Sequence, residues 1–123
     1  MDIDHQESNF EEAAKFFKLL SHPARLKILN EINREEACVC HLEAVLGLRQ
    51  AYISQQLMVL REAGLIRDRR DGWNVFYEVA DPKVAEIIEI SNKFFGNTIS
   101  HASHGDPGKC TCPKCSQGNF IKL

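Results

Sequence analysis

Residues 48–61 read Leu48-Arg49-Gln50-Ala51-Tyr52-Ile53-Ser54-Gln55-Gln56-Leu57-Met58-Val59-Leu60-Arg61, and their pattern predicts one amphipathic helix. Ile53, Leu57 and Leu60 recur at i, i+4 and i+7, which places them in a single apolar stripe. Gly64, just past the end, is typical of a helix stop in the left-handed conformation. The remaining chain is interpreted outward from this helix.

The face opposite the stripe is polar but almost uncharged. A face that only had to dissolve would normally carry Glu and Lys, whereas small, hydroxyl and amide side chains suit the reading of base edges in a DNA major groove. An ordinary polar surface helix is the alternative on this segment alone. The face consists of Gln50 at the entry, then Ala51, Tyr52, Ser54 and Gln55.

The segments on either side complete a DNA-binding pattern. A short helix is predicted to end at Leu46, and Gly47 with a tight turn joins it to the helix above, which makes a helix-turn-helix. After Gly64 the apolar period changes to two, which predicts strands over 65–70 and 73–80 around the hairpin signal Asp71-Gly72. A basic hairpin in this position is a wing that can lie on phosphate backbone. Its arginines are Arg67, Arg69 and Arg70, and one strand face carries Val75, Tyr77 and Val79.

Three further helices are predicted from apolar periodicity. The first covers Phe10 to Leu20, the second runs from Pro23 to about Asn33, and the last runs from Pro82, behind Asp81, to about Ser100. The first and last carry more apolar surface than a small domain needs, so we predict that they form a homodimer interface. The apolar faces are Phe10, Ala13, Phe17 and Leu20, then Leu26, Ile28, Leu29 and Ile32, then Val84, Ile87, Ile88, Ser91, Phe94 and Phe95.

Length and charge bound the organisation. With 123 residues we expect one domain, over 10–100, between a mobile acidic arm (1–9) and a flexible tail that contains cysteines (101–123). No segment approaches the roughly 20 apolar residues of a membrane span, and no secretory leader opens the chain, so we expect a soluble cytoplasmic protein. The net charge is −2, but the basic residues gather within 49–70 and the first twelve residues are acidic.

Five cysteines are many for a chain of this size. Because their number is odd and the expected compartment is reducing, a disulfide framework is not predicted. They cluster at the spacings of metal ligands, as Cys38 and Cys40 and then as Cys110, Cys112 and Cys115.

The run from Leu20 to Pro82 resembles the ArsR/SmtB family of winged helix-turn-helix repressors. The matching pieces are Leu20-Ser21-His22-Pro23-Ala24-Arg25-Leu26-Lys27-Ile28-Leu29, the segment from Ile53 to Ile66, and Arg70-Asp71-Gly72 with Phe76-Tyr77. The resemblance implies a mainly α fold with a β-hairpin wing, a homodimer on double-stranded operator DNA, and release by a metal or metalloid ion. By position it assigns base contacts to Gln50, Tyr52, Ser54 and Gln55.

Cys38-Val39-Cys40 with Leu42 resembles the Glu-Leu-Cys-Val-Cys-Asp-Leu signature of the arsenic- and cadmium/lead-sensing branches. Side chains at i and i+2 do not face each other inside a helix, so these two thiols can share an ion only at an extended helix start. Two thiolates are too few for trigonal arsenic(III) or a closed tetrahedral site. His41 stands where those relatives have Asp, and Glu43 where arsenic sensors often have a third Cys. The N-terminal segment offers only His5.

The tail can supply the missing ligands. From about residue 103 to Cys110 it can span about 24 Å at roughly 3.4 Å per residue, enough to reach the third helix of the same or the partner subunit. We therefore predict one thiolate-rich site that joins Cys38 and Cys40 to Cys110, Cys112 and Cys115. Its effector is As(III), Sb(III), Cd(II), Pb(II) or Zn(II), all of which accept thiolates.

Three alternatives stay open, and one class of protein is excluded. The tail triplet can form a separate site, His101 and His104 can chelate if they are helical, or the thiols can sense oxidants or reactive sulfur without a metal. An enzyme is not predicted, because the chain has no Gly-rich phosphate loop, no nucleophile elbow and no evident carboxylate pair.

Overall fold

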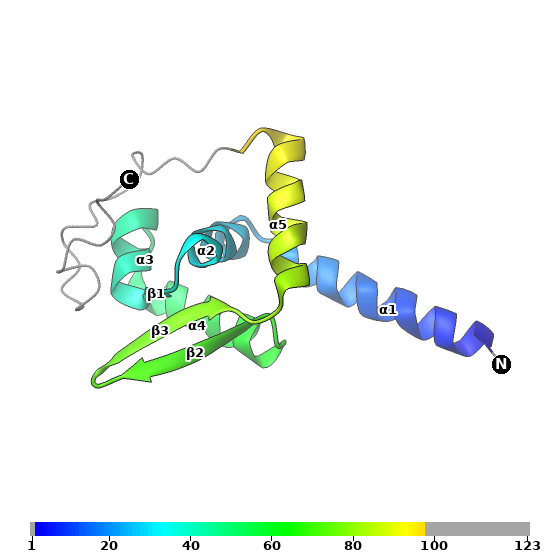
Figure 1. Ribbon diagram of the computed structural model, residues 1–123, viewed down its shortest axis with the longest axis horizontal. Helices are drawn as coiled ribbons and strands as arrows, with labels where there is room; N and C mark the ends of the chain where they lie inside the picture. Colours follow the sequence, from blue (N-terminus) through cyan, green and yellow to red (C-terminus); the bar gives the residue numbers. More distant parts are fainter. Residues whose placement is uncertain (1, 98–123) are drawn as a thin grey trace.

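The computed structural model describes residues 2–97, which form a mainly helical fold with a small antiparallel sheet (Figure 1). This confirms the predicted winged helix-turn-helix class. In chain order the elements are α1 (Asp2–Leu20), α2 (Pro23–Arg34), β1 (Ala37–Cys38), α3 (Val39–Leu46), α4 (Gln50–Glu62), β2 (Ile66–Asp71), β3 (Asn74–Val79) and α5 (Pro82–Phe95).

Helices α3 and α4 form the predicted helix-turn-helix. Gly47 ends α3 in the left-handed conformation (φ 69°), and its N–H donates to the carbonyl of Glu43. Helix α4 then begins at Gln50, two residues later than the predicted start at Leu48, because Arg49 is still extended (ψ 143°). The turn is therefore three residues long, from Gly47 to Arg49, and it sets the angle at which α4 leaves α3.

The core lies where α2, α3 and α4 meet the sheet. The predicted stripe of α4 is fully enclosed, since Ile53, Leu57 and Leu60 are at most 1% exposed. In α2 the predicted side is buried at Ile28, Leu29 and Ile32, whereas Leu26 is 37% exposed and does not belong to the core. At about 100° per residue, Leu26 lies roughly 60° outside the arc that Ile28, Leu29 and Ile32 span, so it is at the edge of the buried face of α2.

The sheet has three strands in the order β1-β3-β2, so β3 is central. The hairpin was predicted, but β1 was not, because two residues are too short to show a periodicity. The alternation of β3 holds, with Tyr77 and Val79 packed partly against the helical core. However, the most buried residue of this strand is Phe76, on the opposite face, because β1 and the start of α3 cover it.

The ends of the chain differ from the prediction. Helix α1 begins at Asp2 rather than at Phe10, and it extends away from the body of the fold (Figure 1). The mobility of residues 1–9 stays a prediction. Residues 2–9 contain no Gly or Pro, and acidic side chains near a helix N-terminus are favourable. Helix α5 begins at the Asp81 cap as predicted but ends before Gly96 (φ 69°), not near Ser100.

The predicted tail (101–123) lies outside the described residues. Within the described part of the chain, none of the helices combines the length and the apolar character that crossing a bilayer requires.

Candidate nucleic-acid interface and thiol site

Helix α4 presents the surface that the sequence predicted for reading DNA. Gln50, Tyr52, Ser54 and Gln55 are all exposed, with 40% of Tyr52 accessible. Their direction is fixed because the opposite side of the helix is enclosed in the core. The exposed surface is an array of amide and hydroxyl groups with hydrogen-bond donors and acceptors free to meet base edges.

Gln56 anchors α4 to the elements behind it. It is 8% exposed, and its Oε1 accepts a hydrogen bond from Nε of Arg25 at 2.7 Å. Arg25 also donates from Nη1 to the carbonyl of Leu19 at 3.2 Å, so one guanidinium ties the end of α1 and the start of α2 to α4. Sequence reasoning did not find this contact, because the two partners are 31 residues apart and Gln56 differs in no visible way from its neighbour Gln55.

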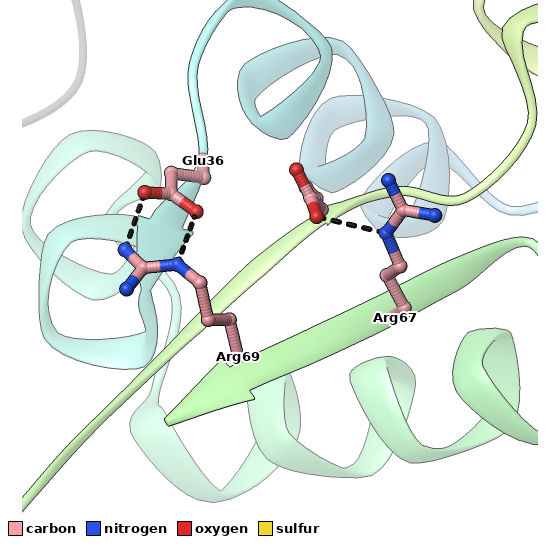
Figure 2. Close-up of polar contacts among 4 residues, drawn as sticks. Glu36, Arg67 and Arg69 are labelled. Carbon is pink, nitrogen blue, oxygen red and sulfur yellow. Dashed lines mark hydrogen bonds and ion pairs between the residues drawn. The ribbon is translucent and has the colours of Figure 1, made fainter. Parts of the chain in front are cut away.

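Two of the three wing arginines are held by carboxylates (Figure 2). Nε of Arg67 donates to Glu78 at 2.8 Å across the hairpin. Arg69 makes a two-point contact with Glu36, from Nε at 3.1 Å and from Nη2 at 2.5 Å. The hydrogen bond to Glu36 raises the pKa of Arg69 further above its usual range, so this arginine is charged at every physiological pH.

The third wing arginine, Arg70, is not held by a carboxylate among the described residues. Arg70 is exposed near the end of β2, and within the described residues it takes part in no ion pair. Of the predicted wing contacts, Arg70 is therefore the cation most available to a phosphate. Arg67 and Arg69 can still present their outer N–H groups, but a carboxylate already offsets each charge.

Cys38 and Cys40 lie together at the start of α3. Cys38 is the extended N-cap residue (φ −88°, ψ 166°), and its Sγ accepts from the backbone N–H of His41 at 3.4 Å. Cys40 is in the first turn, and it packs against the buried pair formed by Cys38 and Phe76. This extended helix start is the geometry that the Cys-x-Cys spacing needs if both thiols are to face one ligand.

The sheet connects these thiols to the wing. In the antiparallel register Cys38 stands opposite Phe76, and Phe76 stands opposite Arg69, so the three side chains form one row on one face. The guanidinium carbon of Arg69 lies 5.0 Å from the centre of the Phe76 ring. Glu36, the hydrogen-bond partner of Arg69, is two residues before Cys38, so Arg69 also contacts the segment that leads into Cys38.

His41 is the other functional side chain at this helix start. It is 2% exposed, and its Nε2 lies 3.5 Å from Oε1 of Glu31, which also pairs with Arg34 at 3.0 Å. His41 thus faces α2 and holds α3 against it. The residue that replaces the expected Asp is a buried residue whose ring nitrogen faces Glu31 on α2.

The described residues supply two thiols but not a complete metal site. Among them no group of three or more His, Cys, Asp or Glu side chains is placed to hold an ion. Two neighbouring thiols fit a soft ion as half of its ligand set. Cys110, Cys112 and Cys115, predicted as the remaining ligands, lie outside the described residues, as do His101 and His104.

Helices α1 and α5 leave a large apolar surface uncovered. The exposed aromatic side chains of α1 are Phe10 (77%) and Phe17 (58%). Those of α5 are Phe94 (79%) and Phe95 (69%), which contact each other edge to face, and Ile90 is 65% exposed nearby. Apolar surface on this scale is typical of an interaction site.

Comparison with known proteins places this arrangement in context. The family model described as "Bacterial regulatory protein, arsR family" matches residues 22–68. A biofilm growth-associated repressor of Agrobacterium fabrum is 45% identical over 84 residues, which are 68% of this chain and 72% of the relative.

Two solved structures extend the comparison. The crystal structure of the transcriptional repressor BigR from Xylella fastidiosa is similar with a TM-score of 0.70, 33% identity, and coverage of 80% of this chain and 98% of that one. The homodimeric winged helix-turn-helix domain of a possible ArsR-family regulator of Mycobacterium bovis shares the fold, with a TM-score of 0.68, 24% identity, and coverage of 84% and 95%.

The packing of the two thiols predicts unequal reactivity. In a variant with serine at all three tail cysteines, we expect a thiol reagent to label Cys40 at least about tenfold faster than Cys38, because Cys38 is 5% exposed and must wait for local opening. Peptide mapping by mass spectrometry gives both rates. Phe76→Ala should reduce the difference and the exposed control Phe94→Ala should not; equal rates without either change would contradict the packing.

Proposed function

The chain belongs to the arsR family of bacterial regulatory proteins and is a DNA-binding transcriptional repressor rather than an enzyme. We propose that a thiophilic metal or metalloid ion, bound through Cys38 and Cys40, releases it from its operator. The observation that carries the proposal is the position of these thiols. Cys38 ends the strand that pairs with the wing, and Cys40 lies in the first turn of α3, the first helix of the helix-turn-helix.

The DNA complex that we propose uses a homodimer. A second copy covers the exposed faces of α1 and α5, which is supported by the homodimeric relative of the same fold. A two-fold axis then carries two α4 helices into successive major grooves, about one helical turn apart. Gln50, Tyr52, Ser54 and Gln55 contact bases, while Arg70 and the outer N–H groups of Arg67 and Arg69 contact phosphates. Such a repressor acts where the chromosome lies, so we retain the cytoplasmic location.

The effector site that we propose is completed by tail cysteines. Cys38 and Cys40 would hold As(III), Sb(III), Cd(II), Pb(II) or Zn(II) as thiolates, and Cys110, Cys112 and Cys115 would supply the other ligands. The ion acts as a crosslink that fixes the start of α3 to the tail. The ion acts only through these coordination bonds and catalyses no reaction.

Release follows from what the start of α3 contacts. A shift of Cys38 moves α3, which the three-residue turn joins to α4, and it disturbs the pairing of β1 with β3. It also moves Glu36, which holds Arg69 on the wing. Both DNA-contacting elements are thus attached to the thiol site, and a coupling of about 1–3 kcal/mol between ion and DNA suffices for a regulatory switch.

Two neighbouring glutamines provide a matched test of the DNA interface. We expect Gln55→Ala to weaken binding to a selected duplex by about 5- to 100-fold, because a base contact is lost, with no change in stability. Gln56→Ala should instead lower the free energy of unfolding by about 1–3 kcal/mol, since Arg25 loses its buried acceptor, and should leave the affinity of the folded protein nearly unchanged. Fluorescence anisotropy and urea unfolding measure the two effects; the same loss of affinity in both variants would contradict the assignment.

Serine substitution tests the effector site. Cys38→Ser and Cys40→Ser should each bind DNA like the wild type, since neither thiol belongs to the DNA surface, but should no longer be released by cadmium or arsenite. The matched control replaces all three tail cysteines. Loss of release in this control supports one joined site, whereas release that persists in both Cys38→Ser and Cys40→Ser overturns the proposal. Release by peroxide that a thiol reductant reverses, with no response to either ion, would establish redox sensing instead.

A further inference from the structure

The tip of the wing carries an indole that the fold does not use. Asp71 pairs with Asn74, so the hairpin turn consists of Gly72 and Trp73. Gly72 supplies the positive φ (64°) that the turn needs, and no side chain at position 73 is required for it. Trp73 is fully exposed (101%), unlike every other large apolar side chain of the described residues.

A partner that covered this ring would remove a large apolar area from water. A buried tryptophan removes 150–250 Å² of surface from water, roughly the largest contribution that one side chain can make. The β2–β3 turn, which contains Trp73, lies at the end of a hairpin that extends beyond the helices (Figure 1).

The neighbourhood of Trp73 indicates which partner this is. Arg70 lies three residues before it and is exposed, and Arg69 and Arg67 follow along the same strand. The hairpin also leaves directly from the end of α4, separated from it only by residues 63–65. The hairpin (66–79) carries three arginines and three carboxylates, but Arg70 takes part in no ion pair among the described residues. An exposed ring beside this arginine, on a hairpin continuous with the helix that we propose reads bases, suits a nucleic-acid backbone and its groove.

We propose that Trp73 enters the minor groove of the duplex beside the major-groove segment that α4 reads, an inference that rests on the proposed DNA binding. The minor groove is about 6 Å wide, which admits a planar ring edge-on and excludes a helix. Apolar side chains at such tips pack between sugars and wedge at base steps. The indole N–H is a donor only, so it can bond the acceptors of an A·T pair but meets the protruding amino group of guanine in a G·C pair. Trp73 therefore selects A·T pairs at the positions that the wing contacts.

Intrinsic fluorescence tests the contact directly, because the chain has a single tryptophan. The probe is a duplex that the wild-type protein selects from a random-sequence pool. On saturation with this duplex we expect a shift of the Trp73 emission to shorter wavelength or its quenching, and a several-fold lower acrylamide quenching constant. Emission and acrylamide access that stay unchanged while anisotropy reports full binding would overturn the inference.

Variants separate an apolar contact from a charge contact. We expect Trp73→Ala to bind the selected duplex about tenfold more weakly, with thermal stability unchanged and with the same dependence of affinity on salt, since no charge is removed. Trp73→Phe should recover most of the affinity. Arg70→Ala should instead reduce the slope of log affinity against log salt by about one unit. An affinity of Trp73→Ala equal to that of the wild type would contradict the inference.

Sequence selection tests the specificity. Pools selected by the wild type should be enriched in A·T pairs at positions flanking the α4 contacts, and pools selected by Trp73→Ala should lose that enrichment while keeping the α4 positions. Equal enrichment in both pools would overturn the assignment of specificity to Trp73.

Two further results of these experiments would have different meanings. No DNA binding by any variant contradicts the proposed function itself. Protection of Trp73 that depends on protein concentration and not on DNA would show that a second copy of the chain covers the ring, which also overturns this inference.

Discussion

The complete burial of one side of α4 is the constraint on which the other features depend. Ile53, Leu57 and Leu60 have almost no contact with solvent, so the helix can neither rotate nor slide without exposing them. The hydrogen bond between Arg25 and Gln56 adds a directional contact to this apolar packing. Because the buried side is fixed, the uncharged polar side faces outward, and its amides and hydroxyls are exposed to solvent. Because only the turn from Gly47 to Arg49 separates α3 from α4, a movement of α3 would change the orientation of that surface.

The sheet connects the start of α3 to the wing as well. The row Cys38, Phe76 and Arg69 crosses all three strands, and Glu36 returns the contact from the wing to the chain just before Cys38. In the mechanism that we propose, a small displacement at the start of α3 would reach the wing through these packed and charge-paired groups. The two-residue strand β1 is part of this connection. Strand β1 pairs Cys38 with Phe76 of β3, which gives the thiols a backbone connection to the wing.

Sequence reasoning recovered the parts of this design that are local in the chain. The period of α4, the glycine after α3, the Asp71-Gly72 turn and the Asp81 cap each act over a few residues, and each is present in the structure. What it missed depends on contacts across the fold. Strand β1 and the burial of Phe76 arise only when distant segments pair, and the Arg69–Glu36 contact joins residues 33 positions apart. The start of α1 was placed too late because its first turns lack an apolar period, although nothing in them breaks a helix. Of the five predicted thiol ligands, the structure describes the surroundings of Cys38 and Cys40 only.

In the proposed mechanism, ion binding at the thiols and release of DNA are one event. The most direct measurement is an anaerobic titration of the reduced wild-type protein, bound to a fluorescent duplex, with cadmium and separately with arsenite, recording thiolate-to-metal absorption and anisotropy on the same sample. We predict that the absorption band and the loss of anisotropy rise together and end at the same number of ions per dimer. A band that saturates while the protein stays on DNA, or release with no band, would contradict this claim.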